Sequence, residues 1–412
     1  MSGPDRFGRM TLLDFFKSGH KPTLLSAFVY SDVSFMVWVL LGPLAVHIGR
    51  DLHLSGAQQY TMVAIPLLTG ALLRIPVGAL VDRYGPLRTG LLCQAAVIVA
   101  LLVASIGHVS SVTGLYLLGA ALGIAGTSMA VALPLAARWY PDEHQGKALG
   151  IAGAASSGTV FTALLAPALA EAYGWHNVLA LAIIPLFAVL FLYVLLAKEW
   201  PAPAASVRPG YARVLAEADL WWFMLFYAVA FGGVLALASL LVLYFHNQYQ
   251  LAPETAGYFT AVCVFAGAAA RPVGGWIADR FGGIKSLQLL FGLTAAGTFL
   301  VGLTPPSSLA AMAMLTVAMA ALGMASGAVF QLVPLRFRNE VGGATGLIGA
   351  AGGLGGFFLA ELLGQSQVLS GSYRAGFLVF AGMAVLSVIG VHKVKSRWRT
   401  TWGSVAATKA RV

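Results

Sequence analysis

The sequence predicts an all-α membrane protein with twelve transmembrane helices in two pseudo-symmetric six-helix bundles. Three observations predict this fold: the chain is strongly apolar, its apolar runs are long enough to cross a bilayer, and landmarks of its first half recur in the second. Of its 412 residues, 59% are hydrophobic and 10% are charged, whereas soluble domains carry about 25% charged residues. This composition excludes a soluble enzyme, a disordered chain and a nucleic-acid-binding domain.

Twelve apolar runs lie between charged residues or clusters of proline and glycine. A helix needs about 20 apolar residues to cross the roughly 30 Å hydrocarbon core. Lipid admits only helices and closed barrels, and these runs are too long and too uniformly apolar for barrel strands. We therefore expect spans near residues 23–48, 57–81, 88–106, 112–138, 146–170, 177–197, 220–245, 254–278, 284–304, 308–335, 342–367 and 374–394.

The basic residues behind the net charge of +10 are distributed as the predicted topology requires. With the N-terminus placed in the cytoplasm, 21 of the 25 Lys and Arg residues fall on the cytoplasmic side, and only Arg50 and Arg374 fall on the other. Because cytoplasmic loops of membrane proteins carry the excess of basic residues, we expect both termini in the cytoplasm. The first 22 residues show no secretory signal.

A motif of the second span returns in the eighth. Glycine, arginine, glycine and aspartate follow each other at four-residue steps, and the second copy lies 197 residues after the first. The copies are Gly70, Arg74, Gly78 and Asp82, then Gly267, Arg271, Gly275 and Asp279. Residues 121–123 and 150–155 also recur, at 321–323 and 346–351. Two parallel six-helix repeats are a transporter plan with substrate at the midplane between the halves.

The repeat divides the chain into five parts. We expect a cytoplasmic tail (1–22), an N-terminal six-helix bundle (23–197), a cytoplasmic linker (198–219), a C-terminal six-helix bundle (220–395) and a cytoplasmic tail (396–412).

Three groups of residues carry a resemblance to a known family. The two copies of Gly-x3-Asp-Arg-x-Gly, at residues 78–85 and 275–282, resemble the cytoplasmic loop signature of the major facilitator superfamily. Residues 123–153, and residues 327–334 running into the glycine-rich eleventh span, resemble the two signatures of its nitrate/nitrite porter family. The resemblance covers about residues 25–395. It implies the major facilitator fold, alternating access of the two halves, and either proton-coupled nitrate uptake or nitrate/nitrite exchange across the inner membrane of a prokaryotic cell.

Arg74 and Arg271 are the strongest candidates for substrate binding. Each lies eight residues before a loop aspartate, so about 12 Å into the membrane. A guanidinium at that depth costs at least ~2.5 kcal/mol and needs a cavity or a partner. Of the 15 acidic residues, 13 fall in loops, tails or helix ends, and the exceptions are Asp32 and Glu361, of which Glu361 lies near an outer end. Two arginine forks facing each other across the repeat axis suit a planar oxyanion.

The resemblance implies further substrate-binding residues. Tyr227 and Phe231 stand four residues apart on the seventh span, where the family stacks an aromatic ring on the anion; packing explains them equally well. Met129 stands where the family has an opposing aromatic residue, and Ser156 where it usually has Asn, which leaves the preference between nitrate and nitrite open. Three glycines, in the fifth and eleventh spans, either allow tight packing or let the backbone reach the substrate. These are Gly153, Gly349 and Gly352.

Other charged residues receive gating or coupling roles. The resemblance implies that the residues at the cytoplasmic helix ends make gating contacts and do not bind substrate. These are Asp82, Arg83, Asp279 and Arg280. Asp32, deep in the first span, is either a proton-coupling group or the partner of a nearby donor, and proton-coupled uptake is modestly favoured because a lone carboxylate there is costly.

Alternative functions remain open from the residues. A carrier of another small anion, such as a carboxylate, would use the same arginines. A membrane enzyme would need a nucleophile–base pair or a metal cluster at midplane depth, and a sensor would need a soluble output domain. Cys93 and Cys263 lie far apart in apolar runs. We expect no enzymatic activity, no cofactor and no metal, and a monomer whose partners are nitrate or nitrite and the lipid bilayer.

Overall fold

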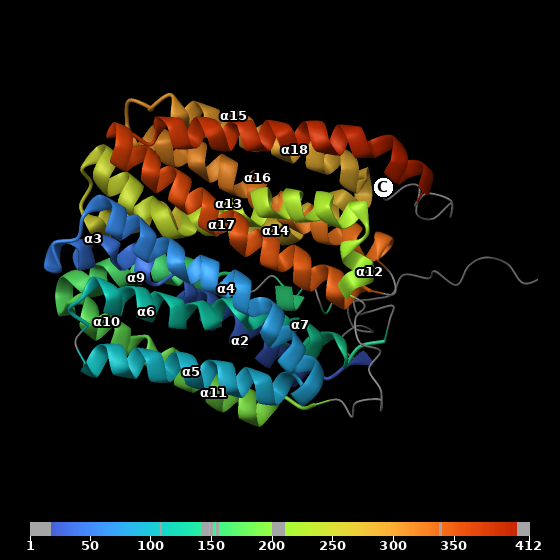
Figure 1. Cartoon of the computed structure of the whole chain (residues 1–412), viewed down its shortest axis with the longest axis horizontal. Coiled ribbons are helices and arrows are strands. Elements are labelled where there is room, and N and C mark those ends of the chain that lie inside the picture. Colours follow the sequence, from blue (N-terminus) through green and yellow to red (C-terminus); the bar gives the residue numbers. More distant parts are fainter. Residues whose placement is uncertain are drawn as a thin grey trace, which may run out of the picture.

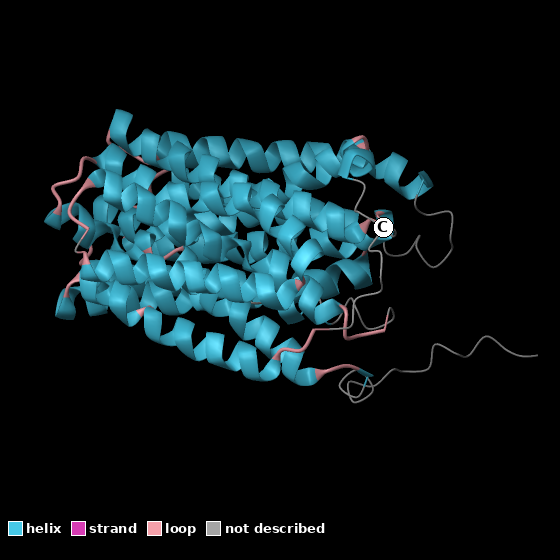
Figure 2. Ribbon diagram, turned by 60° about the horizontal axis from the view of Figure 1, so that its bottom comes forward, coloured by secondary structure: helices cyan, strands magenta, loops and turns pink. Residues whose placement is uncertain are grey.

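The structure of the chain is a computed structural model that describes residues 18–107, 109–141, 148, 151–153, 156–199, 211–337 and 340–401. These residues form a bundle of helices that run roughly along one long axis, as Figure 1 and Figure 2 show. In the described ranges, twelve helices are long and apolar enough to cross a membrane. The twelve predicted spans are therefore confirmed.

Several spans of the N-terminal half consist of more than one helical segment, whereas α4 and α5 are continuous. In chain order the spans of this half are α2 (Lys21–Trp38) with α3 (Leu41–Asp51), α4 (Gly56–Tyr84), α5 (Pro86–Ile106), α6 (Val112–Leu122) with η1 (Gly123–Thr127) and α7 (Ser128–Ala137), residues 151–173 with α9 (Gly158–Tyr173), and α10 (Trp175–Leu181) with α11 (Ile183–Leu196). The fourth span changes from α to 3-10 geometry at η1. Residues 142–147, 149 and 150, which include the predicted start of the fifth span and part of its signature, lie outside the described residues.

The spans of the C-terminal half are continuous helices. They are α13 (Ala218–Tyr249), α14 (Pro253–Phe281), α15 (Gly283–Gly302), α16 (Ser308–Arg336), α17 (Val341–Ser370) and α18 (Arg374–Thr401). A short helix, α12 (Tyr211–Leu215), lies in the predicted linker, of which residues 200–210 are outside the described part. The last helix continues beyond the predicted end at 394 because Trp398 is fully buried, with its ring stacked on Phe223.

The internal repeat appears in the helix boundaries. The pairs α2 and α13, α4 and α14, and α5 and α15 each begin 197 residues apart, at 21 and 218, 56 and 253, and 86 and 283. Gly85 and Gly282 separate the second and third helix of each half with φ of +86° and +92°. Because glycine adopts positive φ at little cost, these turns explain the last glycine of the repeated loop motif.

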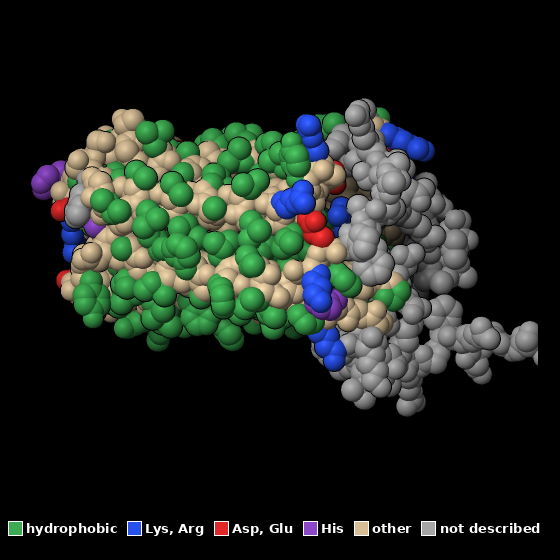
Figure 3. Space-filling view, turned by 90° about the horizontal axis from the view of Figure 1, so that it is seen from below, with side chains coloured by type: hydrophobic (Ala, Val, Ile, Leu, Met, Phe, Trp, Pro, Cys, Tyr) green, Lys and Arg blue, Asp and Glu red, His purple; other side chains and the backbone are tan. Residues whose placement is uncertain are grey.

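The molecular surface has an apolar belt between two polar ends (Figure 3). Large hydrophobic side chains are exposed along the belt, among them Leu92, Val103, Phe191, Phe265 and Leu386. Charged side chains gather at the two ends of the long axis. An exposed apolar belt of this kind fits lipid, so the chain is a multi-pass membrane protein.

The two halves of the chain lie side by side (Figure 1). Helix α4 packs along α17, α9 packs against α14, and α3 packs against α13. Helices α7 and α11 pack mainly against helices of their own half. Because α3 and α9 occupy the end of the bundle away from the termini, the halves meet most closely at that end. We call it the distal end, and the opposite end, where residues 18 and 401 lie, the terminal end.

Buried polar contacts close the distal end. The hydroxyls of Tyr60 on α4 and Tyr373, just before α18, lie 2.5 Å apart. The side-chain amide of Asn247 on α13 donates to Tyr60 Oη at 3.1 Å and to Tyr373 Oη at 3.3 Å. We call these three residues the distal latch, since they join the two halves.

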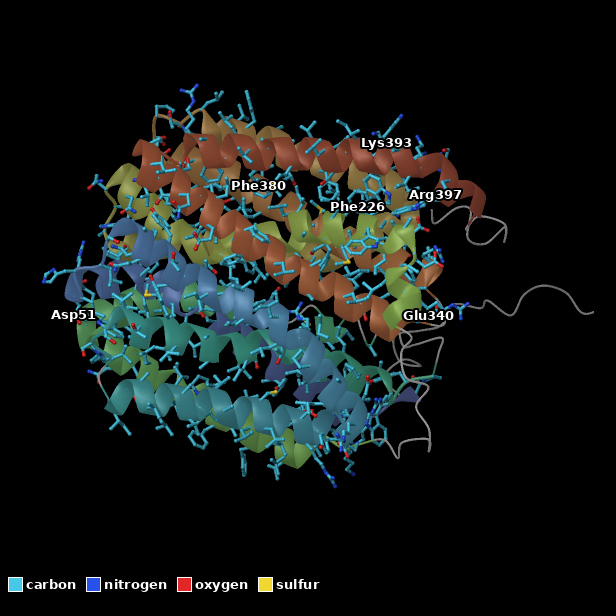
Figure 4. All side chains as sticks on the ribbon, in the orientation of Figure 1. Asp51, Phe226, Glu340, Phe380, Lys393 and Arg397 are labelled. Atoms are coloured by element: carbon cyan, nitrogen blue, oxygen red, sulfur yellow. The ribbon has the colours of Figure 1, made fainter. Side chains whose placement is uncertain are left out.

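An ion cluster holds the C-terminal half together at the terminal end, where Figure 4 labels Arg397 and Glu340. Asp219, at the start of α13, accepts hydrogen bonds from Arg336 Nε at 2.6 Å, from Trp398 Nε1 at 2.7 Å and from Arg397. Arg336 also pairs with Glu217. The cluster ties α13, α16 and α18 together, far from the middle of the bundle.

Candidate functional site

Arg74 lies in the middle of α4 and is only 5% exposed. Its Nη2 donates to the carbonyl oxygen of Gly126 in η1 at 2.7 Å, and its Nη1 donates to the carbonyl oxygen of Gly349 on α17. Its Nε is buried and has no hydrogen-bond partner among the described residues. The guanidinium therefore bridges the two halves through backbone carbonyls and keeps one unused donor.

Glycines allow the backbone to approach Arg74 this closely. A Cβ atom at Gly349 would lie 2.9 Å from Arg74 Nη1. In η1, a Cβ at Gly123 would overlap the hydroxyl of Thr69 on α4. Because η1 packs directly on α4, the Gly126 carbonyl reaches the guanidinium. These glycines serve close packing, and that packing also brings the carbonyls to the arginine.

Arg271 occupies the corresponding place on α14 and is half-buried. Its Nη2 donates to the hydroxyl of Tyr227 at 3.0 Å. Its guanidinium carbon lies 5.2 Å from the centre of the Phe231 ring, within the range of a cation–π contact. Its Nη1 is buried and lacks a hydrogen-bond partner in the described part of the chain.

The two predicted aromatic residues form one stack. The rings of Tyr227 and Phe231 lie 5.0 Å apart and nearly parallel, at 11°. Phe330 on α16 packs edge-on against Tyr227 at 4.7 Å. The stack thus presents a hydroxyl and a ring face to Arg271.

Helix α17 runs between the two arginines. A Cβ at Gly352 would lie 2.7 Å from Tyr227 Cδ1 and 2.9 Å from Phe231 Cδ1. Gly349, one turn earlier on the same helix, faces Arg74. The structure therefore joins six of the predicted substrate-binding residues through direct contacts, which run from Arg74 to Gly349, Gly352, Tyr227, Phe231 and Arg271.

The other predicted substrate-binding residues lie around this group. Ser156 is buried and lines a small pocket beside Arg271 and Phe231. Met129, at 8% exposure, belongs to the apolar core. A Cβ at Gly153 would find only Leu133, at 3.7 Å. Ser156 therefore lies beside the site, Met129 belongs to the apolar core, and Gly153 has room for a side chain.

The predicted gating residues lie at the terminal ends of α4 and α14. Asp279 accepts a hydrogen bond from Gln331 Nε2 on α16 at 3.1 Å. The guanidinium of Arg280 lies 5.5 Å from the Trp276 ring, and that of Arg83 lies 5.2 Å from the Tyr84 ring. Asp82 is the fourth residue of this set, and its carboxylate is attracted by the positive charge of Arg138. Two helical turns separate both aspartates from the arginines of the site.

Asp32 holds the start of α9. Its Oδ1 accepts hydrogen bonds from the Gly158 backbone N–H and from Ser157 Oγ, both at 2.9 Å. A side chain at Gly158 would overlap the backbone of Asp32, so α2 and α9 touch here. Of the two roles that the sequence left open for Asp32, the structure shows the partner of nearby donors, in which the carboxylate caps the start of α9.

Sequence reasoning missed Trp38, which is fully buried between α4 and η1. Its one signal in the sequence is the place of a large indole side chain in the middle of the first predicted span. In the structure it stands directly before the break between α2 and α3. No group of three His, Cys, Asp or Glu side chains within the described ranges could hold a metal ion.

Comparison with known proteins adds the following similarities. The profile of the Major Facilitator Superfamily matches residues 27–360. The chain is 34% identical over 358 residues to a nitrite extrusion protein of Bacillus subtilis (strain 168), across 86% of this chain and 89% of that protein. It is 32% identical to the probable nitrate/nitrite transporter NarK2 of Mycobacterium tuberculosis (strain ATCC 25618 / H37Rv), across 90% and 95%. It is also 32% identical to the probable nitrate/nitrite antiporter NarK1 of Thermus thermophilus, across 87% and 88%.

A solved structure supports the fold independently. The bacterial homolog of the human lysosomal transporter Spinster, in an inward-facing and occupied conformation, aligns with a TM-score of 0.69 at 17% identity, over 90% of this chain and 96% of that chain. At this identity the similarity concerns the fold alone.

Proposed function

Because the chain belongs to the nitrate/nitrite porter family of the Major Facilitator Superfamily, we propose that it exchanges nitrate and nitrite across the inner membrane. The two halves would expose one central site alternately to the two sides. The site is built within a single chain, which supports a monomer as the working unit. The excess of basic residues in the predicted cytoplasmic segments supports a cytoplasmic terminal end. With that orientation, the distal latch closes the site toward the outer side of the membrane.

The observation that carries the proposal is a pair of arginines, Arg74 buried and Arg271 half-buried, for which the described residues supply no carboxylate partner. None of the ion pairs among the described residues includes Arg74 or Arg271. Each arginine keeps one buried nitrogen without an acceptor. An uncompensated charge at the midplane is costly, so an anion is the partner that the site lacks.

Nitrate fits the chemistry of these donors. It is planar, carries one negative charge over three oxygen atoms, and accepts paired in-plane hydrogen bonds from a guanidinium. The Tyr227 hydroxyl can donate to a third oxygen, and the Phe231 ring offers an apolar face. A side chain at Gly349 or Gly352 would fill the space beside these groups, which favours a small anion over a larger carboxylate.

Anion binding would change the contact between the halves. The Gly349 carbonyl, from the C-terminal half, accepts a hydrogen bond from Arg74 of the N-terminal half. An anion oxygen that takes over this Arg74 donor would release Gly349. Substrate binding would then loosen α17 from α4, and this links occupancy to the movement of the halves. Asp82, Arg83, Asp279 and Arg280 would gate the cytoplasmic side.

The hydrogen bonds of Asp32 favour exchange over proton coupling. Two donors tie this carboxylate to the start of α9, so a capping role accounts for its place in the first span without proton transfer. An exchanger needs no titratable group, because it reorients only when an anion offsets part of the charge of the two arginines. We therefore propose exchange as the transport mode, in place of the coupling that the sequence modestly favoured.

Counterflow in proteoliposomes tests the function. Labelled nitrate should enter vesicles loaded with nitrite and should not accumulate in empty vesicles under a pH gradient. Labelled formate with internal formate tests a carboxylate carrier. Accumulation of nitrate driven by the pH gradient alone would contradict exchange, and entry of labelled formate into formate-loaded vesicles without entry of labelled nitrate into nitrite-loaded vesicles would contradict the substrate.

A further inference from the structure

The indole of Trp38 lies at the centre of the N-terminal half of the site. The side chain is fully buried, and its Nε1 donates to the carbonyl oxygen of Pro66 on α4 at 2.7 Å. The Arg74 guanidinium carbon lies 5.8 Å from the ring centre, at the outer limit of a cation–π contact. Trp38 is therefore a direct neighbour of the arginine without bonding to it.

Two glycines form the notch that holds the indole. A Cβ at Gly70 would lie 2.8 Å from Trp38 Nε1, and a Cβ at Gly126 would overlap the ring at Cε2. Gly70 is on α4, one turn before Arg74, and Gly126 is in η1. The ring thus fills the space between α4 and η1 and determines how closely the two segments approach.

This spacing determines where the Gly126 carbonyl lies. That carbonyl accepts the 2.7 Å hydrogen bond from Arg74 Nη2, and the same residue is the one against which the indole packs. Trp38 therefore affects Arg74 indirectly. The indole packs against Gly126, and the Gly126 carbonyl accepts the hydrogen bond that orients the guanidinium.

The second half offers an internal comparison. At the repeat offset of 197, Leu235 stands where the first half has Trp38, and at the offset of 200 Ser326 stands where it has Gly126. In the second half, therefore, the smaller Leu235 stands in place of the indole, and Ser326, which has a side chain, stands in place of glycine. Leu235 and Ser326 line a pocket beside Arg271. The space that Trp38 fills next to Arg74 is thus partly open next to Arg271.

From this asymmetry we propose that Trp38 is a positioning residue that fixes Arg74 as the rigid anion anchor, while Arg271 keeps room to adjust to the anion. Rigid support of a binding group raises affinity because less ordering is left for the binding step. The proposal rests on the proposed anion site but does not depend on which small anion is bound.

Anion affinity of purified variants tests the positioning role. Binding of nitrate, nitrite, formate and chloride is measured by calorimetry, and the variants are compared with whichever anion the wild type binds. Trp38→Leu should weaken binding about tenfold or more, because a hydrogen bond to a charged group contributes roughly that factor. Trp38→Phe, which keeps a ring but loses the bond to Pro66, should show a smaller loss. Trp398→Phe is the matched control, since Trp398 is also fully buried and donates one bond, at 2.7 Å, outside the site.

A double substitution separates positioning from general stability. Gly126→Ser alone should weaken binding, because the new side chain overlaps the indole. Trp38→Leu combined with Gly126→Ser recreates the pair found in the second half and should bind more tightly than Gly126→Ser alone. Independent defects would instead add.

Three results would overturn the proposal. They are unchanged affinity in both Trp38 variants, an equal loss in Trp398→Phe, and additive losses in the double variant. If Trp38→Leu fails to fold, Trp38→Phe replaces it in both tests, alone and combined with Gly126→Ser. A wild type that binds formate but neither nitrate nor nitrite would contradict the proposed function and leave the positioning test intact with formate.

Discussion

Arg74 Nη1 donates a hydrogen bond to the carbonyl oxygen of Gly349, which lies 275 residues further along the chain and in the other half. This bond places a backbone dipole where a substrate oxygen would lie. It partly compensates the buried charge when no anion is present. The same bond also belongs to the contact between α4 and α17, so the two events of transport, binding and reorientation, share one hydrogen-bond donor.

Replacing either arginine by lysine should abolish nitrate transport while the protein still inserts and purifies. Lysine keeps the charge but cannot offer the planar pair of donors. For Arg74→Lys the bonds to Gly126 and Gly349 are also lost together. Nitrate uptake into proteoliposomes measures the effect, and Arg50→Lys, at an exposed distal position, is the control. Uptake close to that of the wild type in either site variant would contradict an anion site at the arginine pair.

Gly349→Ala should lower nitrate affinity and transport rate, because its Cβ would lie 2.9 Å from Arg74 Nη1. Gly352→Val should be more severe, since the side chain would displace both rings of the Tyr227 stack. Gly346→Ala is the matched control on the same helix, because its Cβ would meet no atom within 4 Å. There the substitution should be neutral or slightly stabilising, by up to about 1 kcal/mol. Equal effects at 346 and 349 would mean that helix flexibility, and not the space at Arg74, is what matters.

Substitution of Asp32 should separate capping from proton coupling. Asn keeps an acceptor oxygen, so Asp32→Asn should preserve nitrate-for-nitrite counterflow. Asp32→Ala removes the acceptor and should lower thermal stability, by about 0.5–2 kcal/mol as for other lost helix caps. Thermal unfolding in detergent and counterflow measure the two effects. If the wild type accumulates nitrate under a pH gradient and Asp32→Asn loses only that ability, the carboxylate carries a proton and exchange is the wrong mode.

Weakening the distal latch should shift the protein away from the closed distal end. Tyr60→Phe removes one hydroxyl from the cluster with Tyr373 and Asn247. Tyr60 Oη makes both hydrogen bonds that join the halves in this cluster. At about 1 kcal/mol for each neutral bond, their loss should change the ratio of the two conformations about 30-fold. Distances between spin labels at the distal ends of α4 and α14 measure this ratio. Tyr249→Phe, which loses a bond to Pro305 within the C-terminal half, should leave the ratio unchanged.

Asp279→Asn should slow transport and leave nitrate affinity nearly unchanged. The carboxylate accepts from Gln331 at the terminal end, two turns away from Arg271, so it acts on the movement of α14 against α16 and not on the anion. Parallel measurement of counterflow rate and of nitrate binding in detergent distinguishes the two. A large loss of affinity would contradict its assignment as a gating residue.

Local properties of the sequence determined the spans, the depth of the arginines and the repeat. Hydrophobic length sets where a helix crosses the bilayer, and a fixed rise per residue sets how deep Arg74 and Arg271 lie below their loop aspartates. The last glycine of the loop motif, Gly85 or Gly282, marks a turn with positive φ. The spans, the depth of the arginines and the turns depend on residues close together in the chain, and the repeat follows from comparing the sequence with itself. One sequence was therefore enough to predict them, and the comparisons confirmed the family and the fold.

Only the tertiary structure decided what the side chains of the site touch. The partners of Arg74 come from η1 and α17, the donors to Asp32 come from α9, and the notch around Trp38 needs glycines on two different segments. Backbone carbonyls are present at every residue, so no sequence pattern marks the two that accept from an arginine. Their place depends on how closely distant helices approach, and that distance is set by side-chain packing across the whole bundle.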